Sequence, residues 1–279
     1  MAGHETAGTG ANERAAAPKG LPADPRQLGA PGAQPMFNAP NSVVAVLGGL
    51  VAVHLLRQLL TPVQEEWWVL ALAFIPARFS EFGSLLPGGK VAWFTSFVSH
   101  QFVHADAPHL LINGAWLLAI GSLVARRVGA LRFVSLYLVS GIAGALAFWA
   151  VNPGLAQPVI GASGAVSGLM GAVVRFMFAA INQRRGPELR ENPAAIPRAP
   201  LADVFRDRRA LIMIGSMVGL NLVFGLGLGK LITDGGIAWE AHLGGFAAGL
   251  LLFAWFDHPQ GRTGTAELSE ADEASDGRR

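Results

Sequence analysis

The chain has 279 residues, of which 52% are hydrophobic and 14% are charged, and its mean hydropathy is +0.41. This balance is too apolar for an ordinary soluble domain and indicates a protein that crosses a membrane several times. The net charge of +2 is small and does not indicate nucleic-acid binding, while the absence of cysteine excludes disulfides, thiolate metal sites and a cysteine nucleophile.

Residues 1–41 are rich in Ala, Gly and Pro and hold few large apolar side chains, which predicts a disordered N-terminal tail. They contain no basic segment followed by an apolar run, so we expect no cleaved signal peptide there. Residues 258–279 are polar and predict a second tail. The membrane domain is expected between these tails, over residues 42–257.

Six apolar runs have about the length that crosses ~30 Å of hydrocarbon, and they predict an all-α bundle of six transmembrane helices. In chain order the runs are residues 42–60, 93–124, 133–151, 159–181, 210–228 and 237–256. A further stretch, residues 67–76, is too short to span, and its paired tryptophans favour the headgroup level. We expect it to lie in a long interfacial loop that reaches about Lys90, and a seventh crossing is the alternative.

Arginine excess marks the cytoplasmic loops of membrane proteins. Arg126, Arg127 and Arg132 follow the second run, and residues 182–209, after the fourth run, hold seven arginines against four acids. The loop after the third run, residues 152–158, has no charge. This distribution predicts that both termini are cytoplasmic in a cell (inner) membrane.

A serine lies between glycines at the start of the fourth run, and a histidine lies at the start of the sixth: Ser163 and His242. Small residues recur every four positions beside them, which lets two helix backbones come close. They are Gly164, Gly168 and Ala172 in the fourth run, and Ala241, Gly245 and Gly249 in the sixth. If these faces pack on each other, Ser163 and His242 come within hydrogen-bond reach.

The predicted topology places Ser163 and His242 at the outer ends of their helices, together with His109 and Asn113 of the second run. Polar groups that converge inside a membrane are costly and usually functional. A serine beside an imidazole is an activated nucleophile with its base. His109 and Asn113 are four residues apart and share one helix face, so both can donate to an oxyanion, as can the backbone N–H of Ser163.

No acidic residue in the outer halves of the runs is placed to orient His242, and Asp234 and Glu240 lie in the preceding loop. The sequence therefore favours a Ser-His dyad over a triad.

The chain resembles the rhomboid family of intramembrane serine proteases over about residues 42–257. The matching pieces are His100, His104 and the pair His109 and Asn113; Gly129 with Leu136, Tyr137, Leu138 and Gly141; Gly161, Ala162, Ser163 and Gly164; and Ala241, His242, Gly245 and Gly249. The resemblance implies a rhomboid-like six-helix bundle, with Ser163 as nucleophile, His242 as base, and His109 with Asn113 in the oxyanion hole. It also implies transmembrane proteins as substrates, with no cofactor.

Three positions depart from the family pattern. Phe94 follows Trp93 where arginine is common, and Ser167 stands where some members place a tyrosine against the catalytic histidine. Ala125 replaces an acidic residue and removes an expected ion-pair partner of Arg126 or Arg127.

Two alternatives remain open. Zinc could be ligated by some of His100, His104, Asp106, His109 and His242, which would make a membrane metallohydrolase. That reading leaves the serine between glycines unexplained, and we expect His100 and His104 to bond backbone groups instead. A non-proteolytic rhomboid-like binding protein is the other alternative, although such a protein would be expected to lose the serine or the histidine.

Overall fold

The computed structural model describes residues 39–225, 227 and 237–258. The predicted tails lie outside these residues except for residues 39–41 and His258, and Asp234 lies outside them too. The α-helices are α1 (Asn41–Arg57), α2 (Pro62–Leu72), α3 (Gly89–Ser99), α4 (Ala107–Trp116), α5 (Ser122–Val128), α6 (Ala130–Val151), α7 (Ser163–Asn182), α8 (Gly186–Glu191), α9 (Leu201–Val204), α10 (Arg208–Gly225) and α11 (Trp239–Phe256). Shorter turns are η1 (Pro76–Phe79), η2 (Glu81–Leu85), η3 (His100–Phe102), the π-helical η4 (Leu117–Gly121) and η5 (Pro193–Ala195).

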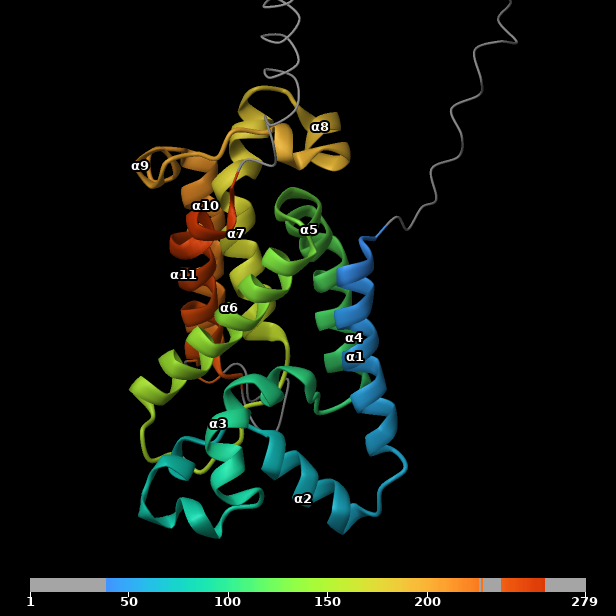
Figure 1. The fold of residues 1–279 in the computed structure, drawn as a ribbon. Coiled ribbons are helices and arrows are strands. Elements are labelled where there is room, and N and C mark those ends of the chain that lie inside the picture. The colour runs from blue at the N-terminus through green and yellow to red at the C-terminus, as the bar shows by residue number, and fades with distance from the viewer. Residues whose placement is uncertain (1–38, 226, 228–236, 259–279) are drawn as a thin grey trace, which may run out of the picture. The chain divides into compact units, whose positions relative to one another are not determined.

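Four helices among the described residues are long and apolar enough to cross a membrane. They are Ala107–Val128, which joins α4, η4 and α5, then Ala130–Val151, Ser163–Asn182 and Arg208–Gly225. The runs predicted first and last correspond to α1, a shorter apolar helix, and to α11, which carries Glu240 and His242 in its first turn. The protein is thus a helical membrane bundle (Figure 1).

The second predicted run is wrong at its N-terminal end. In place of one helix over residues 93–124, α3 ends at Ser99 and a new helix begins at Ala107. The Asp106 carboxylate caps the new helix by accepting from the His109 N–H at 2.7 Å, and a proline occupies the first turn. His100 and His104 therefore lie in a connection between two helices and not within a span.

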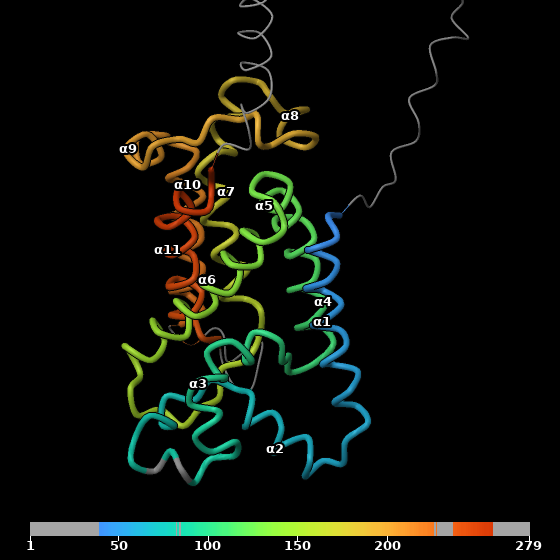
Figure 2. Tube along the Cα trace, viewed as in Figure 1, coloured from blue at the N-terminus to red at the C-terminus, as the bar shows by residue number. Residues whose placement is uncertain are grey.

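The long loop expected before Lys90 is also largely helical. Thr61 and Gln64 form a capping box at the start of α2, and Pro62 opens the helix. Phe74 then pairs with Val159 in an isolated antiparallel bridge, which is the β-type pairing found in the described residues. Figure 2 shows α2 and α3 at one end of the helices and α8 and α9 at the other.

α7 is the central helix of the bundle. Of the 18 most apolar consecutive residues of α7, 72% are buried. The corresponding share for α10 is 11%, so α10 lies at the periphery. α7 packs against α11 along the small residues that the sequence singles out (Figure 1). A Cβ atom added to Gly245 would collide with the Gly164 carbonyl, and one added to Gly249 would collide with the Gly168 carbonyl. The predicted packing of these two faces is confirmed.

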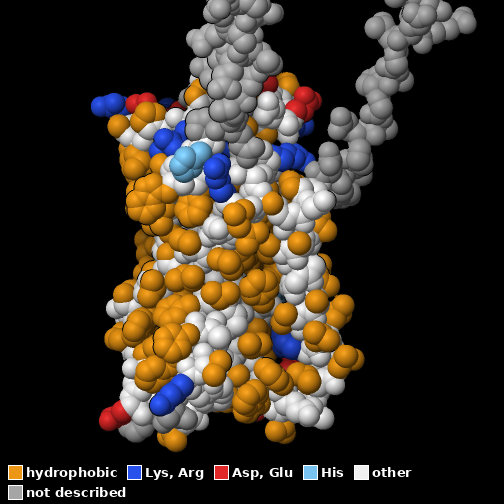
Figure 3. Space-filling view, in the orientation of Figure 1, with side chains coloured by type: hydrophobic (Ala, Val, Ile, Leu, Met, Phe, Trp, Pro, Cys, Tyr) orange, Lys and Arg blue, Asp and Glu red, His pale blue; other side chains and the backbone are white. Residues whose placement is uncertain are grey.

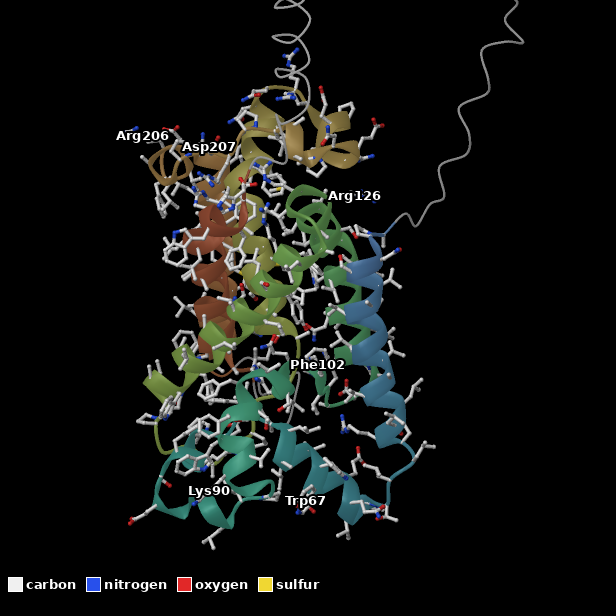
Figure 4. All side chains as sticks on the ribbon, in the orientation of Figure 1. Trp67, Lys90, Phe102, Arg126, Arg206 and Asp207 are labelled. Atoms are coloured by element: carbon white, nitrogen blue, oxygen red, sulfur yellow. The ribbon has the colours of Figure 1, made fainter. Side chains whose placement is uncertain are left out.

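The surface agrees with a membrane protein. On the face seen in Figure 3, apolar side chains cover the middle, and charged side chains gather towards the two ends. Figure 4 shows Arg126, Arg206 and Asp207 at one end, with Trp67 and Lys90 at the other. Paired interfacial tryptophans and terminal charges are typical of helices that end at the headgroup level.

Candidate active site

The structure brings Ser163 and His242 together. Ser163 is the first residue of α7, and His242 lies in the first turn of α11. Because the two helices are in backbone contact through their glycines, their N-terminal ends lie side by side. The Ser163 Oγ is 2.8 Å from His242 Nε2, which is the distance of a direct hydrogen bond.

The other ring nitrogen of His242 has a partner that the sequence analysis does not include. His242 Nδ1 lies 2.8 Å from Oδ1 of Asn221, a residue of α10. The sequence favours a dyad because no acidic residue is placed to orient His242. In the structure an amide, that of Asn221, occupies the position that an acidic residue would take. The Glu240 carboxylate has a different partner, because it accepts from Nδ2 of Asn152 at 2.9 Å. A polar residue inside an apolar run is the signal that could have identified Asn221.

His109 lies against the loop that precedes Ser163. Its Nδ1 accepts from the Ala105 N–H at 3.4 Å, so the proton of the neutral ring belongs on Nε2. Gly161 has φ +119°, and a Cβ atom added there would lie 2.8 Å from His109 Nε2 and 3.8 Å from Ser163 Oγ. The bare Gly161 backbone therefore lets the donor edge of His109 approach the serine.

Asn113 lies one turn further along α4 and is only 4% exposed. Its Nδ2 donates to the His109 carbonyl at 3.0 Å, which uses one of its two amide hydrogens. The structure shows no hydrogen bond between Asn113 and Ser163 or His242 in the described residues. Asn113 thus keeps one donor, on the helix face that carries His109.

His100 and His104 bond backbone groups, as predicted. The His100 carbonyl accepts from the Gly161 N–H at 2.9 Å, and its Nδ1 lies 2.7 Å from the Ser96 carbonyl. His104 Nε2 accepts from the Ala162 N–H at 3.3 Å, and Arg57 donates to the His104 carbonyl. These contacts fix the backbone just before Ser163.

Both histidines of this connection are neutral at pH 7. Burial lowers the pKa of His100 to about 4. Burial also lowers the pKa of His104 to about 4, and the adjacent His109 ring adds to the effect.

The zinc alternative requires at least three ligands in one place. Within the described ranges, no three His, Asp or Glu side chains are grouped so that they could hold a metal ion.

Residues 91–259 match the family model of the rhomboid domain, which covers more than half of the chain. The chain therefore belongs to the rhomboid family, whose members include intramembrane proteases of the hydrolase class.

Three curated relatives are similar to this chain. Rhomboid protease GluP of Bacillus subtilis is 27% identical over 158 residues, which are 57% of this chain and 25% of the relative. RHOMBOID-like protein 4 of Arabidopsis thaliana is 32% identical over 165 residues, 59% of this chain and 34% of the relative. Rhomboid protein 1, mitochondrial, of Saccharomyces cerevisiae is 36% identical over 137 residues, 47% of this chain and 35% of the relative. The chain thus matches no more than about a third of the length of each relative.

Proposed function

We propose that this protein is an intramembrane serine endopeptidase that hydrolyses peptide bonds in or near the transmembrane segments of other membrane proteins. The observation that carries the proposal is the 2.8 Å contact between Ser163 Oγ and His242 Nε2 at the start of two tightly packed helices. Membership of a family that includes a rhomboid protease supports the same activity.

In this proposal Ser163 is the nucleophile and His242 is the general base. As Oγ attacks the scissile carbonyl carbon, its proton passes to His242 Nε2, and the imidazolium then gives that proton to the leaving amine. A water molecule repeats the sequence on the acyl-enzyme, with His242 again taking and returning a proton. The products are two peptide fragments and free Ser163.

The negative oxygen of the tetrahedral intermediate needs donors that are already in position. We assign this role to His109 Nε2–H, to the second amide hydrogen of Asn113, and to the Ser163 backbone N–H. The Gly161 contact supports the assignment of His109. The position of Ser163 at a helix N-terminus supports the third donor, because the first N–H groups of a helix have no partner within it.

We also propose the six-span organisation of the membrane domain over residues 42–257, with α1 and α11 as the first and last spans. The arginine-rich segment over residues 182–209 and both termini would lie in the cytoplasm, and Ser163 would lie near the outer face of a cell membrane. The tails, residues 1–41 and 258–279, are assigned to the cytoplasm by the same argument.

The substrate class follows from the position of the nucleophile. A serine at the end of a span meets a peptide bond only if the substrate helix is locally unwound, because helical carbonyls are engaged in hydrogen bonds. Substrates are therefore expected to be single-span or other transmembrane proteins with helix-breaking residues near the outer leaflet.

The test is cleavage of a model single-span protein by purified protein in detergent or liposomes. Ser163→Ala and His242→Ala should each abolish cleavage, and the double variant should be hardly worse than either, because residues that act as one unit are non-additive. Activity that persists in Ser163→Ala and disappears with a chelator would support the metallohydrolase. A wild-type protein that binds the substrate without cleaving it would support the non-proteolytic alternative.

A further inference from the structure

We infer that Asn221 is a positioning residue for the proposed reaction: its side-chain oxygen holds His242 in the tautomer and orientation that leave Nε2 free to accept the Ser163 proton. The inference rests on the proposed function and goes beyond it, because it adds a third member from α10 to the Ser-His pair.

The hydrogen-bond chain fixes the proton positions in order. Asn221 Nδ2 lies 2.8 Å from the Met217 carbonyl, and a carbonyl oxygen can only accept. The amide nitrogen must therefore face Met217, and the amide oxygen must face His242 Nδ1 at 2.8 Å. An amide oxygen also only accepts, so Nδ1 carries the proton of the neutral ring. The lone pair is then on Nε2, which lies 2.8 Å from the Ser163 hydroxyl.

The burial of Asn221 distinguishes this contact from an incidental one. Of the described side chains of α10, only Ala210 and Asn221 are buried, and Asn221 is 4% exposed. A buried polar amide costs free energy unless it is hydrogen-bonded, and a helix at the edge of the bundle could bury a hydrocarbon side chain here at no such cost. The amide makes its hydrogen bonds to its own helix and to His242.

The same bond acts again during the reaction. When His242 takes the Ser163 proton, its positive charge is shared by both ring N–H groups, and the Nδ1–H donates to the Asn221 oxygen throughout. A neutral amide thereby does the orienting work that a carboxylate does in a Ser-His-Asp triad. α10 is otherwise peripheral, and Asn221 gives this helix a direct hydrogen bond to the proposed reacting pair.

Two substitutions separate positioning from packing. Asn221→Leu keeps the size and removes the acceptor, whereas Asn221→Asp keeps an acceptor oxygen towards His242, adds charge and loses the donor to the Met217 carbonyl. With a positioning role, Leu should lower kcat about 10- to 100-fold at unchanged KM, and Asp should recover much of the rate. With a packing role the order reverses, because Leu suits a buried site and a charge does not. The measurements are cleavage kinetics of the single-span substrate and the rate of Ser163 labelling by a fluorophosphonate.

Leu220→Ala is the matched control, since Leu220 is the preceding residue of α10 and is 54% exposed. It should retain wild-type kinetics, and thermal stability should be measured for all three variants. If the wild-type protein cleaves the substrate and this cleavage depends on Ser163, a normal kcat in Asn221→Leu would overturn this inference and leave the proposed function intact. Loss of activity in Leu that Asp does not recover would also contradict it. Absence of cleavage by the wild-type protein would instead overturn the proposed function.

Discussion

Single donors decide how well the proposed site stabilises charge. Asn113 is almost fully buried, and one of its amide hydrogens is bound to the His109 carbonyl. If the other hydrogen binds the oxyanion, Asn113→Ala should slow cleavage by about 100- to 1000-fold, or ~2.7 to 4 kcal/mol. Ser163 should still react with a fluorophosphonate, although more slowly, because the proposed nucleophile and its proposed base are unchanged.

The control for Asn113 is its neighbour Ile112, which is 61% exposed. Ile112→Ala should cleave normally, and the thermal stability of both variants should be compared with that of the wild type. A stable Asn113→Ala protein with normal turnover would show that this residue is structural and would leave the oxyanion to His109 and backbone donors.

Residues whose chemistry is visible in a short motif could be selected from the sequence. Ser163 and His242 stand beside small residues with a four-residue period, and the period itself predicts the close helix contact that joins them. The partner of Arg127 could not be predicted from a motif of this kind. Ala125 removes the acidic partner that the family pattern would give to Arg126 or Arg127, and the Arg127 guanidinium instead donates two hydrogen bonds of 2.9 Å to the Asp257 carboxylate. No local pattern connects residues 130 positions apart.

Between elements, the α7 and α11 contact leaves no room for a side chain. A Cβ atom at Gly249 meets the Gly168 backbone, which cannot rotate away as a side chain can. Gly249→Ala should therefore destabilise the protein by about 1 to 3 kcal/mol through overpacking and should reduce cleavage by separating Ser163 from His242. The measurements are thermal unfolding in detergent and cleavage rate.

Gly48 of α1 provides the matched control, since nothing lies within 4 Å of a Cβ atom added there. Gly48→Ala should leave cleavage unchanged and should be neutral or stabilising by up to about 1 kcal/mol, as expected for alanine in an open helix position. Equal effects of the two substitutions would contradict the assignment of α7 and α11 as the tight pair.

The connection between α3 and α4 should make stability depend on pH. The pKa of His100 is about 4 in the folded protein, against about 6.5 for an unperturbed histidine. Between these pH values the unfolded chain binds more protons than the folded protein does. The free energy of unfolding is therefore highest above about pH 6.5 and falls as the pH decreases towards 4. At about pH 5 His100 alone should lower the free energy of unfolding by roughly 2 kcal/mol, compared with its value at high pH.

The check is the melting temperature at pH 8 and pH 5 for the wild type and His100→Gln, whose amide can still donate to the Ser96 carbonyl. The loss of melting temperature between the two pH values should be smaller in the variant. Part of the loss should remain, because His104 has a similarly low pKa. An identical loss in both proteins would show that His100 does not carry this dependence.

The helices themselves were predictable wherever an apolar run was uninterrupted, as for α6, α7 and α10. The prediction failed over residues 93–124, where hydropathy continues through a helix end. Hydropathy measures burial in lipid, whereas the cap at Asp106 and the turn before it are local hydrogen-bond features. Asn221 was missed for a related reason: its partner lies on another helix, so its role depends on the packing of α10 against α11.

For the whole molecule, the distribution of charge predicts the orientation in the membrane. A reporter that is active only in the cytoplasm should be active when fused within residues 182–209 and inactive when fused within residues 152–158. The reason is the arginine excess of the first segment and the absence of charge in the second. The opposite pair of results would place Ser163 at the cytoplasmic face and contradict the proposed orientation.

The π turn η4 constrains the number of residues between the two ends of the helix Ala107–Val128. A π turn holds an extra residue, and one residue of an α-helix corresponds to a rotation of about 100° and a rise of about 1.5 Å. His109 and Asn113 precede η4, while Arg127 follows it and binds Asp257. Loss of one residue, such as the exposed Ala119, would leave a regular helix but would turn Arg127 away from Asp257 while His109 and Asn113 stayed in place. We therefore expect homologues that keep both ends of this helix to tolerate substitutions within Leu117–Gly121 more often than insertions or deletions there.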